Sequence, residues 1–428
     1  MATGPAGSLW EATSPPPPPT APLEERIVVD VAVIGAGITG LSTAVHLAER
    51  GVDVAILEAA DAGFGGSGRN SGHVIPTLAA GDPDDLVARF GVERGERLVA
   101  FLRDSADVVW DLVARHTIDC EAVQRGWAMP AHRPSRMKLA ESKHRQWARR
   151  QAPVELWDRA ETAANMGTDT YYGAVFLPRG GHVNPLALCR GLARAAIDTG
   201  GRLHTGSPVL RFERTDEGRW RLTTPKGEVD AEKVVVATNA YTDALVPGLA
   251  KTLVKIVNYQ SATYPMAEDE RASVMPSDIA ASDSRRDLRP FRKDRFGRLV
   301  TGATLALPVL MDRRIRPLIE AKIRDVFPQI HDPRLEHVWS GQIALTQDRM
   351  PRVHELAPGM VTAIAYNGRG MALGAAIGKE LAAWAAGELA VDTLPLPKAP
   401  VRPTPLRSLV GRWAQLVLIP YRSMDRRD

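Results

Sequence analysis

An uninterrupted apolar run close to the N-terminus predicts the first strand of the chain. Residues 27–34 are almost all apolar and mostly β-branched, which is typical of a parallel strand buried on both faces. A glycine-rich turn follows, then apolar positions at helical spacing from Leu41 to Ala48 and a second apolar run from Val52 to Leu57. This order predicts a strand–helix–strand unit that opens an α/β domain.

Further along the chain, stretches with a strand pattern alternate with stretches that have a helical pattern. Residues 81–170 carry many charges at helical spacing, whereas residues 252–345 alternate as in an antiparallel sheet. The additional expected strands span 209–220, 232–238, 253–263, 298–304 and 361–366, and the additional expected helices span 315–326 and 371–390. The pattern predicts an α/β fold with a second, α+β domain built on an antiparallel sheet.

The expected domains are discontinuous along the chain. They are a proline-rich N-terminal arm (1–25), a nucleotide-binding domain (26–80, 175–250 and 335–395), a substrate or cap domain (81–174 and 251–334) and a C-terminal tail (396–428). The proline run of the arm favours extended geometry, and its apolar pair Leu9 and Trp10 either docks on the folded body or belongs to a disordered tail. The apolar residues in 406–421 are expected to pack on the protein itself.

Composition and charge exclude several classes of protein. With 428 residues, 44% of them hydrophobic and 24% charged, the composition is that of a globular protein and excludes disorder throughout, collagen and coiled coil. The 54 basic and 50 acidic residues give a net charge of +4, so no nucleic-acid partner is indicated. We expect the basic stretch 133–150 to be a solvated helix face.

The cysteines and the hydropathy of the sequence bear on disulfides, metal sites, membrane spans and cellular location. Cys120 and Cys189 are far apart in the sequence, so we expect neither a disulfide framework nor a metal site. The sequence has no run of about 18 uncharged apolar residues, and no basic region precedes an apolar run at its N-terminus. A cytoplasmic protein without a membrane span is therefore expected.

The turn after the first predicted strand is a G-x-G-x-x-G motif, residues 35–40, and Glu58 ends the second strand. Gly35 permits the tight turn, Gly37 lets the backbone approach a pyrophosphate, and Gly40 allows the helix to pack close to the strand. Free amides at the start of the helix hold the anion, and Glu58 can accept hydrogen bonds from both ribose hydroxyls of an adenosine. The motif predicts a dinucleotide site, without distinguishing FAD from NAD.

Two more glycine clusters favour FAD. Residues 65–74 follow the second strand, and their glycines let backbone amides approach a bulky planar ligand. Residues 367–371 open the last predicted helix, whose N-terminal amides and dipole favour an electron-rich oxygen such as that of a reduced flavin. An NAD enzyme needs neither cluster, so FAD is the expected cofactor and an NAD-dependent dehydrogenase is the alternative.

With these motifs, residues 236–241 and the stretch from Trp339 to Pro351, the chain resembles the FAD-dependent amine and amino-acid oxidoreductases of the D-amino acid oxidase superfamily. It is most similar to the γ-glutamylputrescine oxidoreductase-like branch, through the N-terminal arm, the S-G-R-N-x-G loop (67–72) and the basic tail. The resemblance implies an FAD-binding Rossmann-like domain of glutathione-reductase type, a second antiparallel-sheet substrate domain and oxidation of a C–N bond.

The motifs and the resemblance together indicate the site residues. The expected cofactor-binding residues are Gly35, Ala36, Gly37, Ile38, Thr39, Gly40, Glu58, Ala59, Ser67, Gly68, Arg69, Asn70, Ser71, Gly72, His73, Val74, Val209, Ala237, Thr238, Asn239, Asn367, Gly368, Arg369, Gly370 and Met371. The expected substrate residues are Tyr259, Gln260, Tyr264, Trp339 and Gln342, and the expected catalytic residues are His73 and Gln342.

Three departures from the family pattern bear on the reaction. Relatives that act on glycine-like amino acids carry an arginine shortly after W-x-G, which pairs with the substrate carboxylate; residues 342–344 are Gln-Ile-Ala, so we expect an amine whose carboxylate, if present, lies far from the reacting carbon. Sarcosine oxidase-like relatives place a lysine above the flavin, but 299–302 contains none, which leaves both oxidase and dehydrogenase behaviour open. The C-terminal third has no cysteine for a thioether link, so non-covalent FAD is expected, with a bond to His73 as the alternative.

The expected reaction is hydride transfer from the amine to the flavin, followed by hydrolysis of the imine to an aldehyde. O2 or another acceptor would reoxidise the flavin, with H2O2 as the product of an oxidase. Two alternatives stay open: an oxidase or dehydrogenase of D-amino acids, glycine or sarcosine, and a non-catalytic flavin-binding protein. The sequence leaves the amine, the acceptor and the oligomeric state undetermined.

Overall fold

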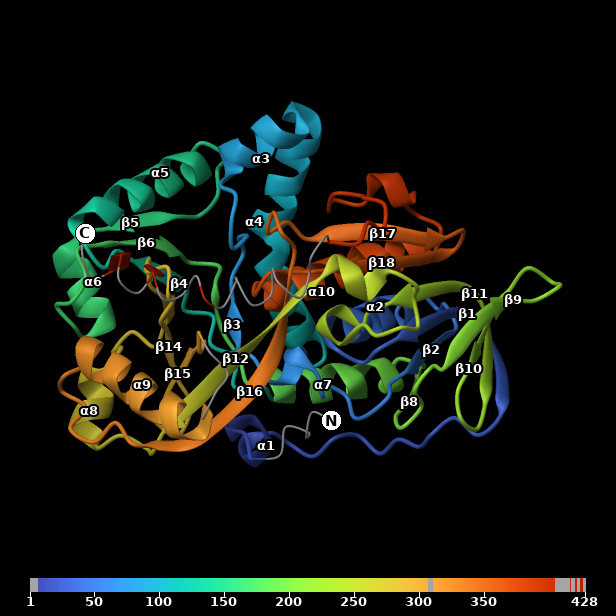
Figure 1. Ribbon diagram of the computed structural model, residues 1–428, viewed down its shortest axis with the longest axis horizontal. Coiled ribbons are helices and arrows are strands. Elements are labelled where there is room, and N and C mark those ends of the chain that lie inside the picture. The colour runs from blue at the N-terminus through green and yellow to red at the C-terminus, as the bar shows by residue number, and fades with distance from the viewer. Residues whose placement is uncertain (1–6, 307–310, 405–415, 417–419, 422–423, 426–428) are drawn as a thin grey trace.

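The computed structural model describes residues 7–306, 311–404, 416, 420–421 and 424–425. In this part of the chain two eight-stranded sheets, each with its own helices, form two lobes (Figure 1). The long strands β12 (Val254–Thr263) and β16 (Leu335–Leu345) run from one lobe toward the other. The first lobe lies on the right of Figure 1 and the second on the left.

The first sheet has a parallel centre with antiparallel additions. Its main path, in spatial order, is β17 (Arg352–Ala357), β18 (Met360–Ile364), β11 (Glu228–Val236), β1 (Arg26–Ile34), β2 (Val54–Leu57) and β8 (Arg202–His204), and β10 (Trp220–Thr223) and β9 (Arg211–Arg214) extend it from β11. Neighbouring strands from β18 to β8 are parallel, while β17 pairs antiparallel with β18. The main helices of this lobe are α2 (Ile38–Ala48), α4 (Val92–Arg115), α7 (Pro185–Asp198) and α10 (Gly370–Ala385).

Strand β1 is buried on both faces, as its apolar run predicts. Val31 and Val33 belong to a core that also holds apolar residues of α2, α4, α7 and α10. Ala32 and Ile34 belong to a second core, which includes Trp220 of β10. Successive side chains point to opposite faces of a sheet, so a strand between two cores needs an uninterrupted apolar sequence. The predicted order β1–α2–β2 is confirmed.

The second sheet is mainly antiparallel. Its strands, in spatial order, are β16, β12, β15 (Leu299–Ala303), β14 (Pro290–Lys293), β13 (Ala280–Ser282), β4 (Trp127–Pro130), β6 (Ala174–Leu177) and β5 (Glu155–Trp157). One pair, β13 with β4, is parallel. The core of this lobe joins α9 (Met311–Val326), through residues such as Ile319, to strand residues such as Phe291 and Leu299.

Sheet membership differs from the predicted domain ranges at two strands. Strands β6 and β16 lie in the second sheet. The sequence pattern had assigned most of β6 (range 175–250) and all of β16 (range 335–395) to the nucleotide-binding domain. β16 pairs with β12 along nearly its whole length. Alternation of apolar and polar residues shows that a segment is a strand, but it does not show which sheet the strand joins. The domain boundaries themselves stay a prediction.

Shorter elements connect the two lobes and cover their edges. They are α1 (Leu9–Thr13), α3 (Pro83–Phe90), α5 (Met137–Ala148), α6 (Arg159–Met166), α8 (Glu268–Ser273), the paired strands β3 (His73–Val74) and β7 (Gly181–His182), and the 3-10 turns η1 (Gly66–Gly68), η2 (Pro134–Arg136), η3 (Asn239–Tyr241), η4 (Leu249–Thr252) and η5 (Val391–Thr393). In α1, Leu9 and Trp10 are fully buried. This burial confirms that the apolar pair of the arm docks on the folded body and does not belong to a disordered tail. The segment 406–421 falls mostly outside the described residues.

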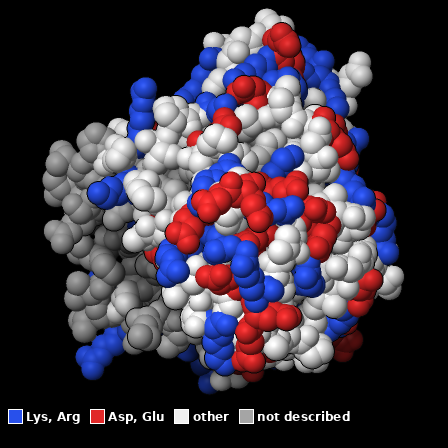
Figure 2. Space-filling view, turned by 90° about the vertical axis from the view of Figure 1, so that its right-hand side faces the viewer, with Lys and Arg blue, Asp and Glu red and all other residues white. Residues whose placement is uncertain are grey.

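Charged side chains of both signs are interspersed on the face drawn in Figure 2. The basic helix α5 is not simply a solvated face, because acidic side chains of neighbouring elements pair with part of it: Lys143 pairs with Asp82, and Arg150, just after α5, pairs with Glu96 of α4 at 2.9 Å. Among the helices that the structure describes, none has both the length and the apolar character needed to cross a bilayer. The same residues bring together no group of three or more His, Cys, Asp or Glu side chains that could hold a metal ion.

Candidate functional site

A cavity of about 710 Å³ lies where the carboxyl ends of β1 and β2 meet strands of the second sheet. This volume is in the range of protein sites for cofactors and small molecules. The predicted site residues that line it are Gly35, Ala36, Gly37, Ile38, Thr39, Glu58, Ala59, Ser67, Arg69, Asn70, Ser71, His73, Val209, Ala237, Thr238, Asn239, Gln260, Gln342, Asn367, Gly368, Arg369, Gly370 and Met371. Segments that are far apart in the sequence therefore share one cavity.

The turn between β1 and α2 can be formed only with its glycines. Gly35 has φ +105°, in the region that favours glycine, and a Cβ on Gly40 would lie 2.0 Å from the carbonyl oxygen of Gly35. A Cβ on Gly37 would lie 2.8 Å from Oγ of Ser67, so a larger residue here would displace that side chain. Helix α2 begins at Ile38 without a side-chain cap from Gly37. Its positive end faces the cavity, as a pyrophosphate site requires.

Glu58 follows β2 directly and lines the cavity. Its carboxylate accepts hydrogen bonds from the backbone amides of Ala36, at 2.7 Å, and Ala60, at 2.9 Å. Burial raises the pKa of this carboxyl, while the amide hydrogen bonds act in the opposite direction. The remaining acceptor capacity of the carboxylate suits the hydroxyl donors of a ribose.

The loop after β2 is held by its own side chains. Asn70 donates from Nδ2 to the carbonyl oxygens of Gly66, at 3.0 Å, and Ser67, at 2.8 Å, and its Oδ1 accepts from the amide of Gly72 at 2.7 Å. Arg69 donates from Nε to the carbonyl of Phe64 at 2.7 Å. These side-chain hydrogen bonds hold the backbone of the loop in one conformation beside the cavity.

Four predicted binding residues do not line the cavity: Gly40, Gly68, Gly72 and Val74. The glycines serve close packing behind it, because a Cβ on Gly68 would lie 2.3 Å from the carbonyl of Gly63, and one on Gly72 would lie 2.0 Å from that of Val183. Val74 is fully buried in the core of the first lobe.

The third glycine cluster brings the start of α10 to the same cavity. Oδ1 of Asn367 accepts from the amide of Thr346 at 2.9 Å, which ties the cluster to the end of β16. Gly370 and Met371, at the first turn of α10, line the cavity. The positive end of α10 therefore faces the cavity.

His73 lies on β3 and lines the cavity, but only 6% of its surface is exposed. Its Nδ1 contacts Oγ of Ser282 at 3.4 Å, and its Nε2 has no hydrogen-bond partner among the described residues. Burial, aided by the charge of Arg292, holds the pKa of His73 well below its usual 6.5. The imidazole is therefore neutral at neutral pH.

The expected substrate residues divide into two groups. Gln260 and Gln342 line the cavity, whereas Tyr259, Tyr264 and Trp339 do not. Side chains alternate along β12, so Tyr259 packs in the core of the second lobe when Gln260 faces the cavity. Tyr264 is 51% exposed. Trp339 stabilises the loop 67–72 by donating from its indole N–H to the Arg69 carbonyl at 2.9 Å.

Comparison with known proteins now decides the family. The family of FAD dependent oxidoreductases known as DAO matches residues 30–384. The chain belongs to this family. It is 31% identical over 366 residues to gamma-glutamylputrescine oxidoreductase of Escherichia coli (strain K12), covering 85% of each protein. It is 30% identical over 402 residues to the probable oxidoreductase OrdL of Rhizobium meliloti (strain 1021), covering 93% of each.

Solved structures show the same fold. Glycine oxidase from Geobacillus kaustophilus superposes with a TM-score of 0.70 at 21% identity, covering 85% of this chain and 96% of that one. An L-amino acid deaminase from Proteus vulgaris gives 0.72 at 21% identity, covering 89% and 95%. The protein is thus an FAD-dependent oxidoreductase, and the preference for FAD over NAD is confirmed.

The DAO-family cavity also contains residues that the sequence reasoning missed. Asn258 lines it two residues before Gln260, Ser282 lines it from the end of β13, and Thr304 lines it directly after β15. The period of two along a strand could have identified Asn258 in place of Tyr259. Ser282 and Thr304 carry no local signal, because only the pairing of distant strands brings them to the cavity.

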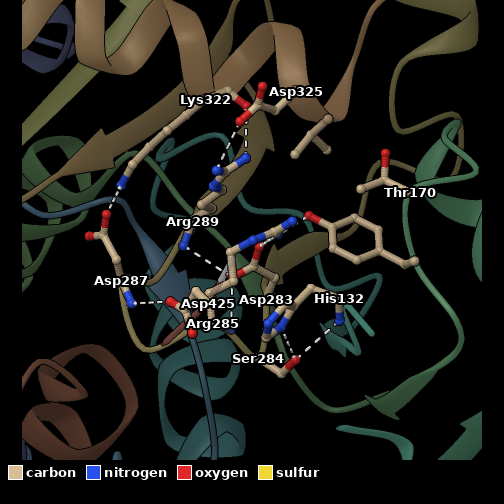
Figure 3. A network of polar contacts seen from close by, with 12 residues as sticks. His132, Thr170, Asp283, Ser284, Arg285, Asp287, Arg289, Lys322, Asp325 and Asp425 are labelled. Atoms are coloured by element: carbon tan, nitrogen blue, oxygen red, sulfur yellow. Dashed lines mark hydrogen bonds and ion pairs between the residues drawn. The ribbon is translucent and has the colours of Figure 1, made fainter. Parts of the chain in front are cut away.

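The loop 283–290 also contributes residues to the cavity lining, and Figure 3 shows the polar contacts around this loop from close by. Asp287 pairs with Lys322 at 3.0 Å, and its amide donates to the Asp425 carboxylate at 3.1 Å. In the same network Arg289 pairs with Asp325 at 3.0 Å. The charged side chains of this loop in Figure 3 therefore form ion pairs and hydrogen bonds with their neighbours.

Proposed function

We propose that the enzyme oxidises the primary amine of a polyamine-derived substrate whose carboxylate lies far from the reacting carbon, with γ-glutamylputrescine as the model compound. The main support is the cavity wall that adjoins the three FAD loops. It presents the amides of Asn258, Gln260 and Gln342, and residues 342–344 offer no guanidinium for a neighbouring carboxylate. The relative from Escherichia coli that is 31% identical is named for γ-glutamylputrescine.

The residues of three loops would hold the cofactor. The turn 35–40 and α2 would hold the pyrophosphate, Glu58 the ribose, and the loops 65–72 and 367–371 the flavin ring. When bound, FAD supplies the acceptor for the hydride that leaves the carbon next to the substrate nitrogen. We propose that the attachment is non-covalent, since neither Cys120 nor Cys189 is among the lining residues.

The chain's own side chains can orient the amine. Nε2 of Gln260 donates to Oδ1 of Asn258 at 2.6 Å, which fixes one amide pair in the wall, and Oε1 of Gln260 is buried without a partner among the described residues. This oxygen is free to accept a hydrogen bond from an amine N–H. We propose that the ammonium proton leaves to solvent or to the neutral His73 before the hydride departs.

The reaction balances without a further group from the protein. The C–N bond becomes C=N as the carbon gives up a hydride, and water then adds to the iminium to release an aldehyde and ammonia. Catalysis then rests on positioning and on exclusion of water rather than on a strong acid or base.

Anaerobic mixing of the holoenzyme with a panel of amines tests this function. We expect γ-glutamylputrescine to bleach the flavin absorbance much faster than glycine, sarcosine or D-alanine does. Faster bleaching by one of the small amino acids would support a glycine or D-amino acid enzyme, and no bleaching by any compound would support a flavin-binding protein without turnover. Readmitting O2 and measuring H2O2 would then separate an oxidase from a dehydrogenase.

A further inference from the structure

The cavity wall includes four arginines within the described ranges: Arg69, Arg286, Arg349 and Arg369. Arg69 donates to backbone carbonyls of its own loop and of β16. Arg286 lies 3.5 Å from the Asp425 carboxylate. Arg349 is exposed to solvent. Arg369 differs from these three, because it is partly withdrawn from solvent and has no acidic partner among the residues that the structure describes.

The guanidinium of Arg369 is held in place by an aromatic ring. It lies over the indole of Trp127, 4.9 Å from the ring centroid. Trp127 is almost fully buried on β4, and its Nε1 donates to Oγ of Ser282 at 3.4 Å. Stacking occupies the face of a guanidinium and leaves its N–H edges available, which is the arrangement that binds a carboxylate with two parallel hydrogen bonds.

The local charge balance also favours an anion. Burial lowers the pKa of Arg369 to about 10, so the side chain remains a cation at neutral pH. The neighbouring His73 is neutral under the same conditions, and the positive end of α10 begins at Gly370. A partly buried cation without a counter-ion is unfavourable unless a ligand supplies one.

We propose that Arg369 is the specificity-determining residue that binds the substrate carboxylate, at the end of the molecule opposite the reacting amine. This inference rests on the proposed function, in which the substrate carries such a remote carboxylate. It assigns to the start of α10 the anchoring role that residues 342–344 cannot perform, and it predicts that the enzyme discriminates between amines that differ only by that carboxylate.

A matched pair of amines isolates the carboxylate. γ-Glutamylputrescine and 4-aminobutyrylputrescine share the amide and the reacting butylamine, and the second lacks only the carboxylate. In stopped-flow flavin reduction by the holoenzyme, we expect the apparent Kd of the first to be about 10- to 100-fold lower, as for a hydrogen bond to a charged group. Arg369→Gln should raise the Kd of γ-glutamylputrescine by that factor and leave the Kd of 4-aminobutyrylputrescine unchanged, while Arg369→Lys should retain part of the preference.

Arg214→Gln is the matched control. Arg214 also stacks on an indole, 4.1 Å from the Trp220 centroid, but neither residue lines the cavity. This variant should behave as the wild type with both amines. Binding of glutarate to the oxidised holoenzyme, followed by the flavin spectrum, gives a readout without turnover, and Arg369→Gln should abolish the spectral change.

Several outcomes would overturn the proposal. Equal Kd values for the two amines in the wild type would do so even if Arg369→Gln failed to fold. An equal effect of Arg369→Gln on both amines, together with a lowered midpoint potential, would assign Arg369 to the charge of the reduced flavin instead. Loss of the preference in Arg286→Gln but not in Arg369→Gln would place the anchor elsewhere. If neither amine reduced the wild-type flavin, the proposed function itself would fail.

Discussion

The N-terminal arm contacts the loop 67–72 through Trp10. Trp10 is fully buried, and its Nε1 donates to the carbonyl of Asn70 at 2.8 Å. Its ring meets Trp339 edge-on with the centroids 5.6 Å apart, and Trp339 donates to the carbonyl of Arg69. Arg292 covers the Trp10 ring at 4.6 Å. The two indoles thus fix two consecutive carbonyls of the loop.

Two substitutions separate the hydrogen bond from the packing. Trp10→Phe keeps an aromatic ring but leaves the Asn70 carbonyl without its indole donor, which should lower the free energy of unfolding by about 1–3 kcal/mol. Trp10→Ala also leaves a cavity, and the loss should be about 3–5 kcal/mol. If FAD has to restore the same loop geometry on binding, Trp10→Phe should raise the Kd for FAD about 5- to 150-fold.

The assay is titration of the apoprotein with FAD, followed by quenching of flavin fluorescence, alongside urea unfolding. Trp220→Phe is the control, because Trp220 likewise donates to a backbone carbonyl, that of Pro358 at 3.2 Å, in a part of the first lobe that does not line the cavity. It should lower stability without changing the Kd for FAD. The reasoning is refuted if Trp10→Phe leaves the Kd unchanged, or if both variants raise it equally.

Four further predictions concern the cofactor site, the amine and stability. Gly40→Ala should yield protein without bound flavin, because its Cβ would lie 2.0 Å from the Gly35 carbonyl, and a normal ratio of flavin to protein absorbance would contradict this. Glu58→Gln should raise the Kd for FAD about tenfold or more in the same titration, since a charged acceptor is lost; an unchanged Kd would remove Glu58 from the ribose site. His73→Asn should leave the pH midpoint of anaerobic flavin reduction in place, because the buried His73 is already neutral and the midpoint belongs to the amine; a shifted midpoint would assign the proton to His73. Burial lowers the pKa of the His132 imidazole to about 3 in the folded protein. As the pH falls below about 6.5, this imidazole is protonated in the unfolded chain but not in the folded one, so the free energy of unfolding should drop by about 2 kcal/mol by pH 5 through this residue. Urea unfolding of His132→Asn should show a correspondingly smaller loss on acidification, and an identical loss would contradict the assignment.

The predictable parts of the fold are those that are determined by residues close together in the sequence. The apolar run of β1, the glycine turn and the spacing of α2 each follow from a few consecutive residues, and the structure has all three. The same holds for the glycine cluster before α10. The short helix α1 was not predicted, because it exists through the burial of Leu9 and Trp10 against distant residues rather than through its own sequence.

The parts of the site that sequence could not locate depend on tertiary pairing. Trp127 and Ser282 meet Arg369 and His73 only because β4 and β13 lie side by side in the second sheet. Arg369 was expected to bind the cofactor as a member of a motif. That its side chain has no acidic partner among the described residues, on which the substrate proposal rests, is visible only in three dimensions.

Release of the flavin from the purified protein tests the central claim most directly. If three distant loops close around a single FAD, then denaturation and centrifugation should leave one equivalent of FAD per chain in the supernatant, identified by chromatography against authentic FAD. Colourless protein that takes up no FAD on addition would contradict the account of the site, and flavin that stayed with the precipitated chain would contradict non-covalent attachment.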